Sequence, residues 1–542
     1  MATKRTFSRE ELGPKLPMMS ALRTIIETPF YGNNVVEVKD LAQAYEMAKN
    51  SPGTVVTDLP IEQPEALGLP ADAKVLLFND GSVTGRAAAA RRIVGDEGVN
   101  VPELNKKVMD AVYETRWNTM YHAQVFVGLD EDFMVRAHLL IPEGEENILY
   151  DWMLNFQPVT EKYEEMYKNS KPIEGEGDIY VFSDPQWSHP DHPLGLTYFD
   201  SAHNCAALLG MKYFGEHKKG TLTLAWSIAN RHDYACCHGG CKTFNPDGEK
   251  PYTLAVFGLS GSGKSTLTHA KHDGKYDIRV LHDDAFIIST NDFSSIALEP
   301  AYFDKTADYP ASSPDNKYLL TVQNCGITLD DDGHKIIVSE DIRNGNGRAV
   351  KSRLWSPNRV DVLHQPMTAV AWIMKDPVLP PLVRVHDPAI AALMGATLST
   401  KRSSAERLAK GVDPNALVIE PYANPFRTYP LNDDFKKFHE LFEQGVACYI
   451  LNTGSFLDQK VPKEVTIAAI ESLVDETTEW QPMAALDGCD AAVIEGFEVP
   501  DTAEYHEQVK GSMQKRTEFL QSQKDFNRLP EEMLTKLLDL VK

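Results

Sequence analysis

The residues of this chain best suited to chemistry form a glycine-rich loop directly after an apolar stretch, residues 252–257. In such a loop the backbone N–H groups surround phosphate, a lysine neutralises the β- and γ-phosphates, and the next hydroxyl joins a Mg²⁺ shell. Because a chance Gly/Ser turn seldom carries Lys and Ser at these offsets, the pattern predicts a strand, a phosphate-binding loop and a helix that together hold ATP or GTP. The loop residues are Gly258, Leu259, Ser260, Gly261, Ser262, Gly263, Lys264, Ser265 and Thr266.

A pair of acidic residues further along the chain could bind metal ions next to this loop. The apolar stretch 277–281 ends in His282, Asp283 and Asp284, which predicts a strand with two carboxylates at its C-terminal end. Open α/β sheets bind ligands at that edge, where one aspartate reaches the Mg²⁺ of the nucleotide through water and its neighbour binds a second cation. A solvated Asp-Asp turn is the alternative, and the intact loop just upstream favours the metal-binding interpretation.

Two segments before the loop carry further candidates. Tyr213 precedes the adjacent Lys218 and Lys219, and His238 stands among small residues. Taken singly these signals are weak, because a lysine pair is usually part of a solvated face.

Cysteines beside His238 leave two structural interpretations open, a partial zinc site or a packed core strand. Zinc is the less favoured, because no second ligand pair follows at finger or ribbon spacing. The cysteines are Cys236, Cys237 and Cys241, and Cys205, His203 or His232 could supply more distant ligands.

Composition places the chain among globular enzymes that act on small molecules. Its 542 residues, 42% hydrophobic and 24% charged, predict a large core and at least two domains. A formal net charge of −24 argues against a nucleic-acid partner. The N-terminus has no apolar leader and no stretch has the length of a membrane span, so we expect a cytosolic protein without a membrane partner. Seven cysteines, an odd number, indicate reduced thiols rather than a secreted disulfide framework.

The order of patterns along the chain predicts two domains. A turn cluster at residues 245–251 suggests a boundary between an N-terminal substrate-binding domain, 1–245, and a C-terminal nucleotide-binding domain, 246–542. Helical patterning is expected at 101–121, at 505–522 and at 530–542, the last two forming a helical tail, and a lid or connecting loop at 183–193. Strands are expected at 133–141, 278–281, 326–329, 336–339, 368–374 and 447–451, with a hairpin turn at 330–333.

Together these elements resemble the ATP-dependent phosphoenolpyruvate carboxykinase family, of which the chain looks like a divergent member. The resemblance runs in the family's order over roughly residues 80 to 470 and is patchy between motifs. The matching segments are Thr84, Gly85 and Arg86; Tyr213 to Gly220; His238; Gly258 to Thr266; Asp283 and Asp284; Leu379, Pro380 and Pro381; Asn346, Gly347 and Arg348; and Asn452, Thr453 and Gly454.

The resemblance implies a fold, a reaction and cofactors. The fold would be α/β in two domains, with a mononucleotide-binding C-terminal domain built on a mixed sheet and an active-site cleft between the halves. The reaction would turn oxaloacetate and ATP into phosphoenolpyruvate, CO₂ and ADP, with Mg²⁺ on the nucleotide and Mn²⁺ at the substrate. The alternatives are a related ATP-dependent kinase that acts on another small carboxylate or hydroxyl compound, and a nucleotide-binding sensor without turnover.

The resemblance also implies a role for each matching residue. Lys219, His238 and Asp284 would hold Mn²⁺, and Ser265 would hold Mg²⁺. As a metal ligand Lys219 must be a neutral amine, which a nearby cation and Lys218 would favour. The remaining implied roles fall to Arg86 at the substrate carboxylate, Tyr213 at the CO₂ side, Arg348 and Lys264 at the transferred phosphoryl group, Ser260 among the catalytic residues, and Asp283, Arg348 and Lys460 among the nucleotide-binding residues.

The chain departs from the family pattern at four places. The polar stretch after the family's substrate arginine is replaced by residues 87–90, all alanine, and then Arg91 and Arg92, so an ordinary basic helix start remains an alternative for Arg86. The family's phosphate-contacting lysine segment is replaced by residues 291–297, which contain no lysine, the glutamate after Asp-Asp by Ala285, and the Arg-bearing stretch after Asn-Thr-Gly by residues 455–460.

Overall fold

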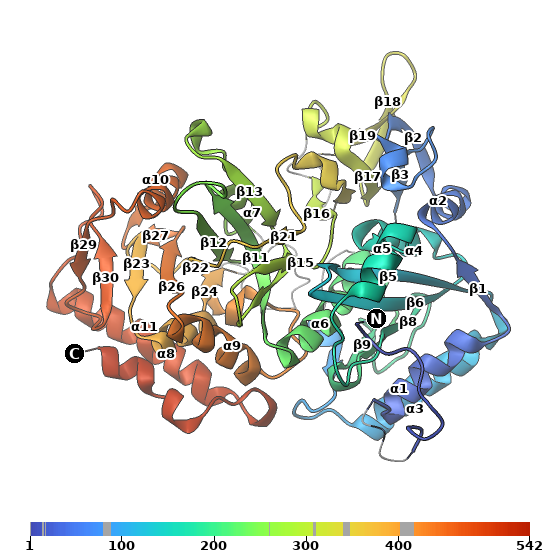
Figure 1. The fold of residues 1–542 in the computed structure, drawn as a ribbon, viewed down its shortest axis with the longest axis horizontal. Coiled ribbons are helices and arrows are strands. Elements are labelled where there is room, and N and C mark those ends of the chain that lie inside the picture. Colours follow the sequence, from blue (N-terminus) through green and yellow to red (C-terminus); the bar gives the residue numbers. More distant parts are fainter. Residues whose placement is uncertain are drawn as a thin grey trace. The chain divides into compact units, whose positions relative to one another are not determined.

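The computed structural model describes residues 2–13, 16, 18–79, 88–259, 261–306, 310–339, 347–401 and 417–541. They fold into two compact units (Figure 1). Unit 1 contains the described residues of 1–228 and 298–357, and unit 2 those of 229–297, 358–403 and 411–542. The units divide the chain differently from the single boundary expected near residue 245, because strands from residues 302–351 pair with the strand at 74–78. The division of substrate and nucleotide binding between two domains remains a prediction.

Unit 1 is built on two sheets with helices against them. The larger sheet has the strand order β1-β5-β6-β8-β10-β9-β4, with β7 added to β5, and the smaller has the order β16-β20-β17-β3-β2. The strands are β1 Val35–Val38, β2 Val55–Pro60, β3 Lys74–Phe78, β4 Arg91–Ile93, β5 Met120–Asp130, β6 Phe133–Pro142, β7 Gln157–Pro158, β8 Ile179–Asp184, β9 Leu196–Asp200, β10 Cys205–Leu209, β16 Tyr302–Lys305, β17 Leu319–Gln323, the hairpin β18 Gly326–Leu329 and β19 Lys335–Val338, and β20 Arg348–Lys351. The helices are α1 Ala21–Glu27, α2 Leu41–Asn50, α3 Val101–Glu114, α4 Glu146–Asn155, α5 Glu161–Asn169 and α6 Phe214–Arg231, whose last turn belongs to unit 2.

Apolar side chains of α1 and α3 cover one face of the larger sheet of unit 1. Leu22 and Ile26 of α1 and Leu104 and Val108 of α3 recur at helical spacing, so each helix presents one apolar stripe to the strands. On the other face of the sheet α6 packs at ordinary van der Waals distance, with Gly220 next to Phe199 and Leu208.

Unit 2 is built on a mixed sheet of the order β21-β15-β14-β11-β12-β22-β26-β23-β30-β29, with β13 also paired to β11. Its strands are β11 Tyr234–Phe244, β12 Tyr252–Phe257, β13 Ile278–His282, β14 Ala285–Ser289, β15 Ser295–Ala297, β21 Val362–Leu363, β22 Ala369–Met374, β23 Leu382–Val385, β26 Ala447–Asn452, β29 Trp480–Pro482 and β30 Cys489–Ala492, with the small hairpins β24 Ser399–Lys401 with β25 Leu417–Ile419 and β27 Ser455–Phe456 with β28 Gln459–Lys460. The helices are α7 Lys264–Thr268, α8 Pro388–Ala396, α9 Leu431–Glu443, α10 Lys463–Val474 and α11 Ala503–Ser522. The mixed sheet expected for this part of the chain is confirmed.

Helices cover both faces of the central strands of unit 2. On one face Leu254 and Val256 of β12 pack with Leu267 of α7 and Ile470 of α10. On the other face the rings of Phe257 and Trp372 lie 5.0 Å apart and pack against Phe438 of α9. Strand side chains alternate between faces, so a continuous apolar run such as β12 is suited to this doubly covered position.

Two expected helices are shorter than their sequence patterns suggest. The helix expected at 101–121 ends at Glu114, passes through a 3₁₀ turn, Thr115–Trp117, and gives way to β5, because the N–H of Met120 donates to Asn34 and starts strand pairing. The stretch 530–542 contains the 3₁₀ helices Glu531–Met533 and Lys536–Leu540 in its described part instead of one α-helix. Within the described ranges, no helix combines the length and the apolar character needed to cross a membrane.

Candidate functional site

The glycine-rich loop lies between β12 and α7, at the place where the sequence predicts it. Gly261 and Gly263 have φ of +81° and +98°, a left-handed conformation that residues with a side chain seldom adopt. Leu259 and Ser262 are buried, and Gly263 is the N-cap of α7. The backbone thus has the strand, turn and helix order in which N–H groups converge on phosphate. Gly258, Lys264, Ser265 and Thr266 stand in this context as expected, and Ser260 lies outside the described residues.

Strand β11 changes partners beside this loop. Its first half pairs with β14, its second half with β13, and residues 239–244 also pair with β12 on the opposite side. Gly240 lies directly under α7, where a Cβ atom would be 1.8 Å from Oγ1 of Thr268. The close approach of this strand to the helix therefore requires glycine, and it holds α7 against the sheet.

The turn between β13 and β14 presents the two predicted aspartates. The N–H of Asp284 donates to Nδ1 of His282 at 3.1 Å, and its carbonyl accepts the N–H of Gly239 at 2.9 Å. Asp283 is buried, and Asp284 is partly exposed. The N–H and the carbonyl of Asp284 are thus both hydrogen-bonded, which fixes the turn. The strand ends where the sequence predicts, and the turn holds both carboxylates beside the loop.

His238 and Asp284, which the family resemblance assigns to one metal ion, lie close together. Nε2 of His238 lies 3.0 Å from Oδ1 of Asp284. Nδ1 of the same ring contacts the carbonyl oxygen of Ala423, which can only accept, so Nδ1 carries a proton. A neutral His238 therefore directs the lone pair of Nε2 at a carboxylate oxygen. Two acceptors at this distance repel each other unless a proton or a cation lies between them, and imidazole nitrogen and carboxylate oxygen are both ligands of divalent ions. The residues present fit a divalent cation.

Lys264 completes this cluster. Its Nζ lies 3.8 Å from Oδ1 of Asp284, and its side chain is nearly buried. Asp283 contacts Nε2 of His269 at 3.5 Å. Burial alone would raise the pKa of Asp283, but the contact with His269 and the charges of His269, His282 and Lys264 hold it well below its usual range. Asp283 therefore stands as an anion next to the phosphate-binding loop.

The Asn-Thr-Gly segment also lies at the loop. Oγ1 of Thr453 donates to the carbonyl of Ser262 at 3.0 Å, and Nδ2 of Asn452 donates to three backbone carbonyls that hold the turn. Lys460, a predicted nucleotide-binding residue, is exposed on β28. Lys375, which the sequence interpretation missed, donates from Nζ to the carbonyl of Gly261 at 3.3 Å.

Tyr213, Lys219 and Arg348 belong to unit 1. Tyr213 precedes α6, and its ring occupies the space where a Cβ on Gly215 would lie, at 2.4 Å. Lys219 is nearly buried on α6. The adjacent Lys218 is fully buried, with Nζ 3.1 Å from Oε1 of Glu299, so its charge is compensated and acts less on Lys219 than an isolated ammonium would.

Arg348 begins β20, with its side chain buried and Nη1 donating to the carbonyl of Gly347. Arg86, Thr84, Gly85 and Asn346 lie outside the described residues. The described part of the segment after Arg86 begins with a 3₁₀ turn, Ala88–Ala90, and Arg91 then starts the short strand β4, with Nη2 3.4 Å from Oε2 of Glu216.

The cysteines beside His238 are fully buried in β11. Burial raises the pKa of the Cys236, Cys237 and Cys241 thiols, which opposes the thiolate form that zinc binds. Within the described residues there is no group of three or more His, Cys, Asp and Glu side chains arranged to hold a metal. The packed-strand interpretation is therefore favoured here.

Three contacts of the site were missed by sequence reasoning. The carbonyl of Ala423 is a backbone group, for which no side-chain pattern exists. His269 had a usable signal, since it follows the loop at helical spacing and lies one turn beyond Ser265. Lys375 had one too, because a lysine directly after the apolar stretch 368–374 emerges at the same sheet edge as the loop.

Comparison with known proteins identifies a family to which this chain is similar. The family model described as phosphoenolpyruvate carboxykinase matches residues 47–503. A relative from Aeropyrum pernix, named phosphoenolpyruvate carboxykinase (ATP), is 28% identical over 294 residues, which cover 51% of this chain and 58% of the relative. A relative from Trypanosoma cruzi, named phosphoenolpyruvate carboxykinase (ATP), glycosomal, is 24% identical over 213 residues, 35% of this chain and 41% of the relative. The matched part of the chain thus spans only about half the length of these relatives. Since the family model covers most of its residues, the chain belongs to the phosphoenolpyruvate carboxykinase family.

Proposed function

We propose that this protein catalyses the ATP-dependent decarboxylation and phosphorylation of oxaloacetate to phosphoenolpyruvate, CO₂ and ADP. The observation that carries the proposal is the pairing of His238 with Asp284 next to Lys264 and the phosphate-binding loop. A protein that only holds a nucleotide needs no second metal ligand set beside the phosphates. The names of the relatives, which specify ATP, agree with the proposed nucleotide.

The residues of unit 2 would share the work as follows. The loop amides and Lys264 would bind the phosphates and offset the charge that develops on the transferred phosphoryl group. Ser265 would ligate Mg²⁺, with Asp283 reaching that ion through water. His238 and Asp284 would hold Mn²⁺, with the carbonyl of Ala423 keeping Nε2 of His238 available as ligand. When bound, this ion supplies positive charge to the oxygen that becomes negative as CO₂ leaves.

The residues of unit 1 would bind the substrate. Lys219, as a neutral amine, would be a third ligand of the Mn²⁺. Arg86 would hold a carboxylate of oxaloacetate through two parallel hydrogen bonds, Tyr213 would line the CO₂ side, and Arg348 would add charge at the transferred phosphoryl group. Two further points remain predictions. A cytosolic location is tested by cell fractionation, and the absence of partners other than small molecules by measuring the native mass.

The metal site is tested by electron paramagnetic resonance titration with Mn²⁺ alone. We expect binding without nucleotide, weaker as pH falls because imidazole and amine ligands must lose protons to bind metal. His238→Ala and Asp284→Asn should each abolish this binding, whereas His439→Ala, on the surface of α9, should leave it unchanged. Mn²⁺ binding that requires ATP and survives His238→Ala would remove this site.

The reaction is tested by detecting phosphoenolpyruvate from oxaloacetate under saturating ATP and Mn²⁺, with wild type and Arg86→Lys compared. Wild type should make the product and Arg86→Lys should lose much of the turnover, because lysine cannot form the paired hydrogen bonds. If wild type makes none but binds ATP and Mn²⁺, a kinase with another carboxylate or hydroxyl substrate takes the place of this proposal. Equal turnover of both proteins would make Arg86 a scaffold residue.

A further inference from the structure

We propose that Lys375 is an additional phosphate-binding residue of the nucleotide site. The inference rests on the proposed function of the loop, and it adds a residue that no resemblance assigns. Its starting point is the contact between Nζ of Lys375 and the carbonyl of Gly261, at 3.3 Å, in the middle of the loop.

The sheet brings Lys375 to the loop. Strand β22, which ends at Met374, runs parallel to β12, with Phe257 opposite Trp372. Parallel neighbours end at the same edge of a sheet, so the residue after β22 emerges beside the residues after β12. Gly454 leaves room for this arrangement, since a Cβ there would lie 3.2 Å from both Cα and Cβ of Lys375.

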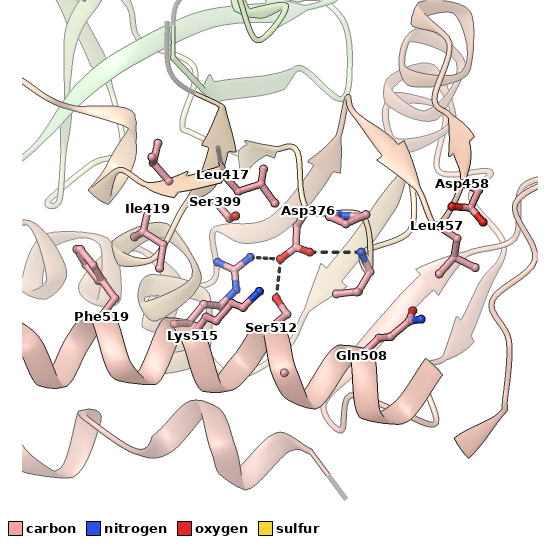
Figure 2. Close-up of a pocket in the computed structure, with 15 residues that line it drawn as sticks. Asp376, Ser399, Leu417, Ile419, Leu457, Asp458, Gln508, Ser512, Lys515 and Phe519 are labelled. Atoms are coloured by element: carbon pink, nitrogen blue, oxygen red, sulfur yellow. Dashed lines mark hydrogen bonds and ion pairs between the residues drawn. The ribbon is translucent and has the colours of Figure 1, made fainter. Parts of the chain in front are cut away.

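The next residue fixes the direction of the lysine. Asp376 lines a cavity of about 850 Å³, where Figure 2 shows it directed at Ser512 of α11. Its Oδ2 accepts from Oγ of Ser512 at 2.6 Å and from Nη2 of Arg516 at 2.8 Å. Successive side chains of an extended chain point to opposite sides, so this buried ion pair turns Lys375 toward the phosphate-binding loop.

The surroundings of Lys375 would favour a bound anion. Its N–H donates to the carbonyl of Ser399 at 3.0 Å, which fixes the start of β24, the strand that ends in Lys401. Burial and the charge of Lys401 lower the pKa of Lys375, so both disfavour an uncompensated ammonium group at this place. Within the part of the chain that the structure describes, neither lysine forms an ion pair with a carboxylate. A phosphate group would supply the missing charge.

The test measures binding by calorimetry, with ATP and inorganic tripolyphosphate as probes. Lys375→Met should weaken both by about 10- to 100-fold, the range of a charge-assisted hydrogen bond, and raised salt should shrink the difference. Lys375→Arg should keep most of the affinity. The matched control is Lys250→Met, since Lys250 is exposed and pairs with the exposed Glu476.

Two results would overturn the inference. One is equal tripolyphosphate affinity of wild type and Lys375→Met. The other is full affinity of Lys375→Gln, because a neutral donor to Gly261 would then suffice and the charge would have no role. Mn²⁺ binding by each variant reports that unit 2 is folded.

The two proposals fail separately. A wild type that binds ATP through Lys375 but makes no phosphoenolpyruvate contradicts the proposed reaction alone. A wild type that makes phosphoenolpyruvate while Lys375→Met binds tripolyphosphate equally contradicts the assignment of Lys375 alone. A wild type that binds neither ATP nor tripolyphosphate overturns both.

Discussion

Lys264 is the residue on which the nucleotide site most depends. Lys264→Ala should abolish turnover and weaken ATP binding by about 1.5–3 kcal/mol, the value of a hydrogen bond to a charged group. Calorimetry measures the affinity, and Lys250→Ala, which removes an exposed lysine of the same unit, is the control. Unchanged ATP affinity in Lys264→Ala would contradict the phosphate-loop assignment.

Single residues could be predicted where their role follows from a local pattern. The loop glycines, Lys264 and the Asp283–Asp284 turn were found because their spacing along the chain is itself the signal. The tautomer of His238 could not be predicted, because it is set by a backbone carbonyl 185 residues away. The ion pair between Lys218 and Glu299 could not be predicted either, because the two residues are far apart along the chain.

At the scale of elements, the contact between β11 and α7 makes a sharp prediction. Gly240→Ala should lower the free energy of unfolding by about 1–3 kcal/mol, because its Cβ would overlap Oγ1 of Thr268. ATP affinity should fall with it, since α7 carries Lys264. Urea unfolding and calorimetry measure the two effects.

Two variants separate this clash from a general effect of replacing glycine. Thr268→Ala in the Gly240→Ala background should restore part of the stability by removing Oγ1. Gly511→Ala should be neutral or slightly stabilising, because nothing lies within 4 Å of its added Cβ and alanine favours helices. Equal losses in Gly240→Ala and Gly511→Ala would contradict the packing argument.

A buried histidine between strands β5, β6 and β8 predicts how stability depends on pH. Nδ1 of His138 lies 3.0 Å from Nε2 of His122, and its Nε2 lies 3.0 Å from Oδ2 of Asp178. Burial lowers the pKa of His138 to about 4, whereas an unfolded histidine has a pKa of about 6.5. Its neutral form therefore stabilises the fold fully above about pH 6.5, and this contribution is lost as pH falls toward 4.

The free energy of unfolding that His138 contributes should fall by about 3 kcal/mol between pH 6.5 and 4. Each unit of difference between its unfolded and folded pKa corresponds to about 1.4 kcal/mol. His138→Gln, which does not titrate in this range, should be less stable at neutral pH but should show a flatter decline between pH 6.5 and 4. Urea midpoints at a series of pH values measure both slopes. Parallel slopes would mean that other groups dominate the acid response.

Elements were predicted best where their signal is short in range. The strand expected before the loop is β12, and the expected hairpin is β18 and β19, joined by the predicted turn. The expected helix at 101–121 was too long, because its apolar pattern runs on into β5, whose start depends on pairing with the chain near Asn34. Local periodicity cannot show where a distant strand takes over the hydrogen bonds.

At the scale of the whole molecule, pairing between distant strands decides which residues belong to each compact unit, and local sequence patterns do not show this pairing. Strand β17 pairs in parallel with β3, about 245 residues earlier, so residues 298–357 join unit 1. The turn cluster at 245–251 marks a true connection between β11 and β12, yet both strands belong to the same sheet. A composition shift identifies a turn, but strand partners define a compact unit.

The ion pair between Arg516 and Asp376 ties the C-terminal helix to the nucleotide site. Arg516→Met should lower the free energy of unfolding by about 3–5 kcal/mol, because it leaves a buried carboxylate uncompensated, and it should also weaken ATP binding by releasing Lys375. Asp376→Asn in the Arg516→Met background should recover part of the stability. A double-mutant cycle by urea unfolding gives the coupling, and additive losses would contradict it.

The flanking segments also set a limit on how the protein can be shortened. The family model spans residues 47–503, yet Asp178 accepts a hydrogen bond from Thr3, and Asp376 is neutralised by Arg516. A recombinant fragment trimmed to the matched region would strip donors from one buried carboxylate in each unit. We expect such a fragment to aggregate on expression and to be cut by proteases, which limited proteolysis of residues 47–503 beside the full chain would measure.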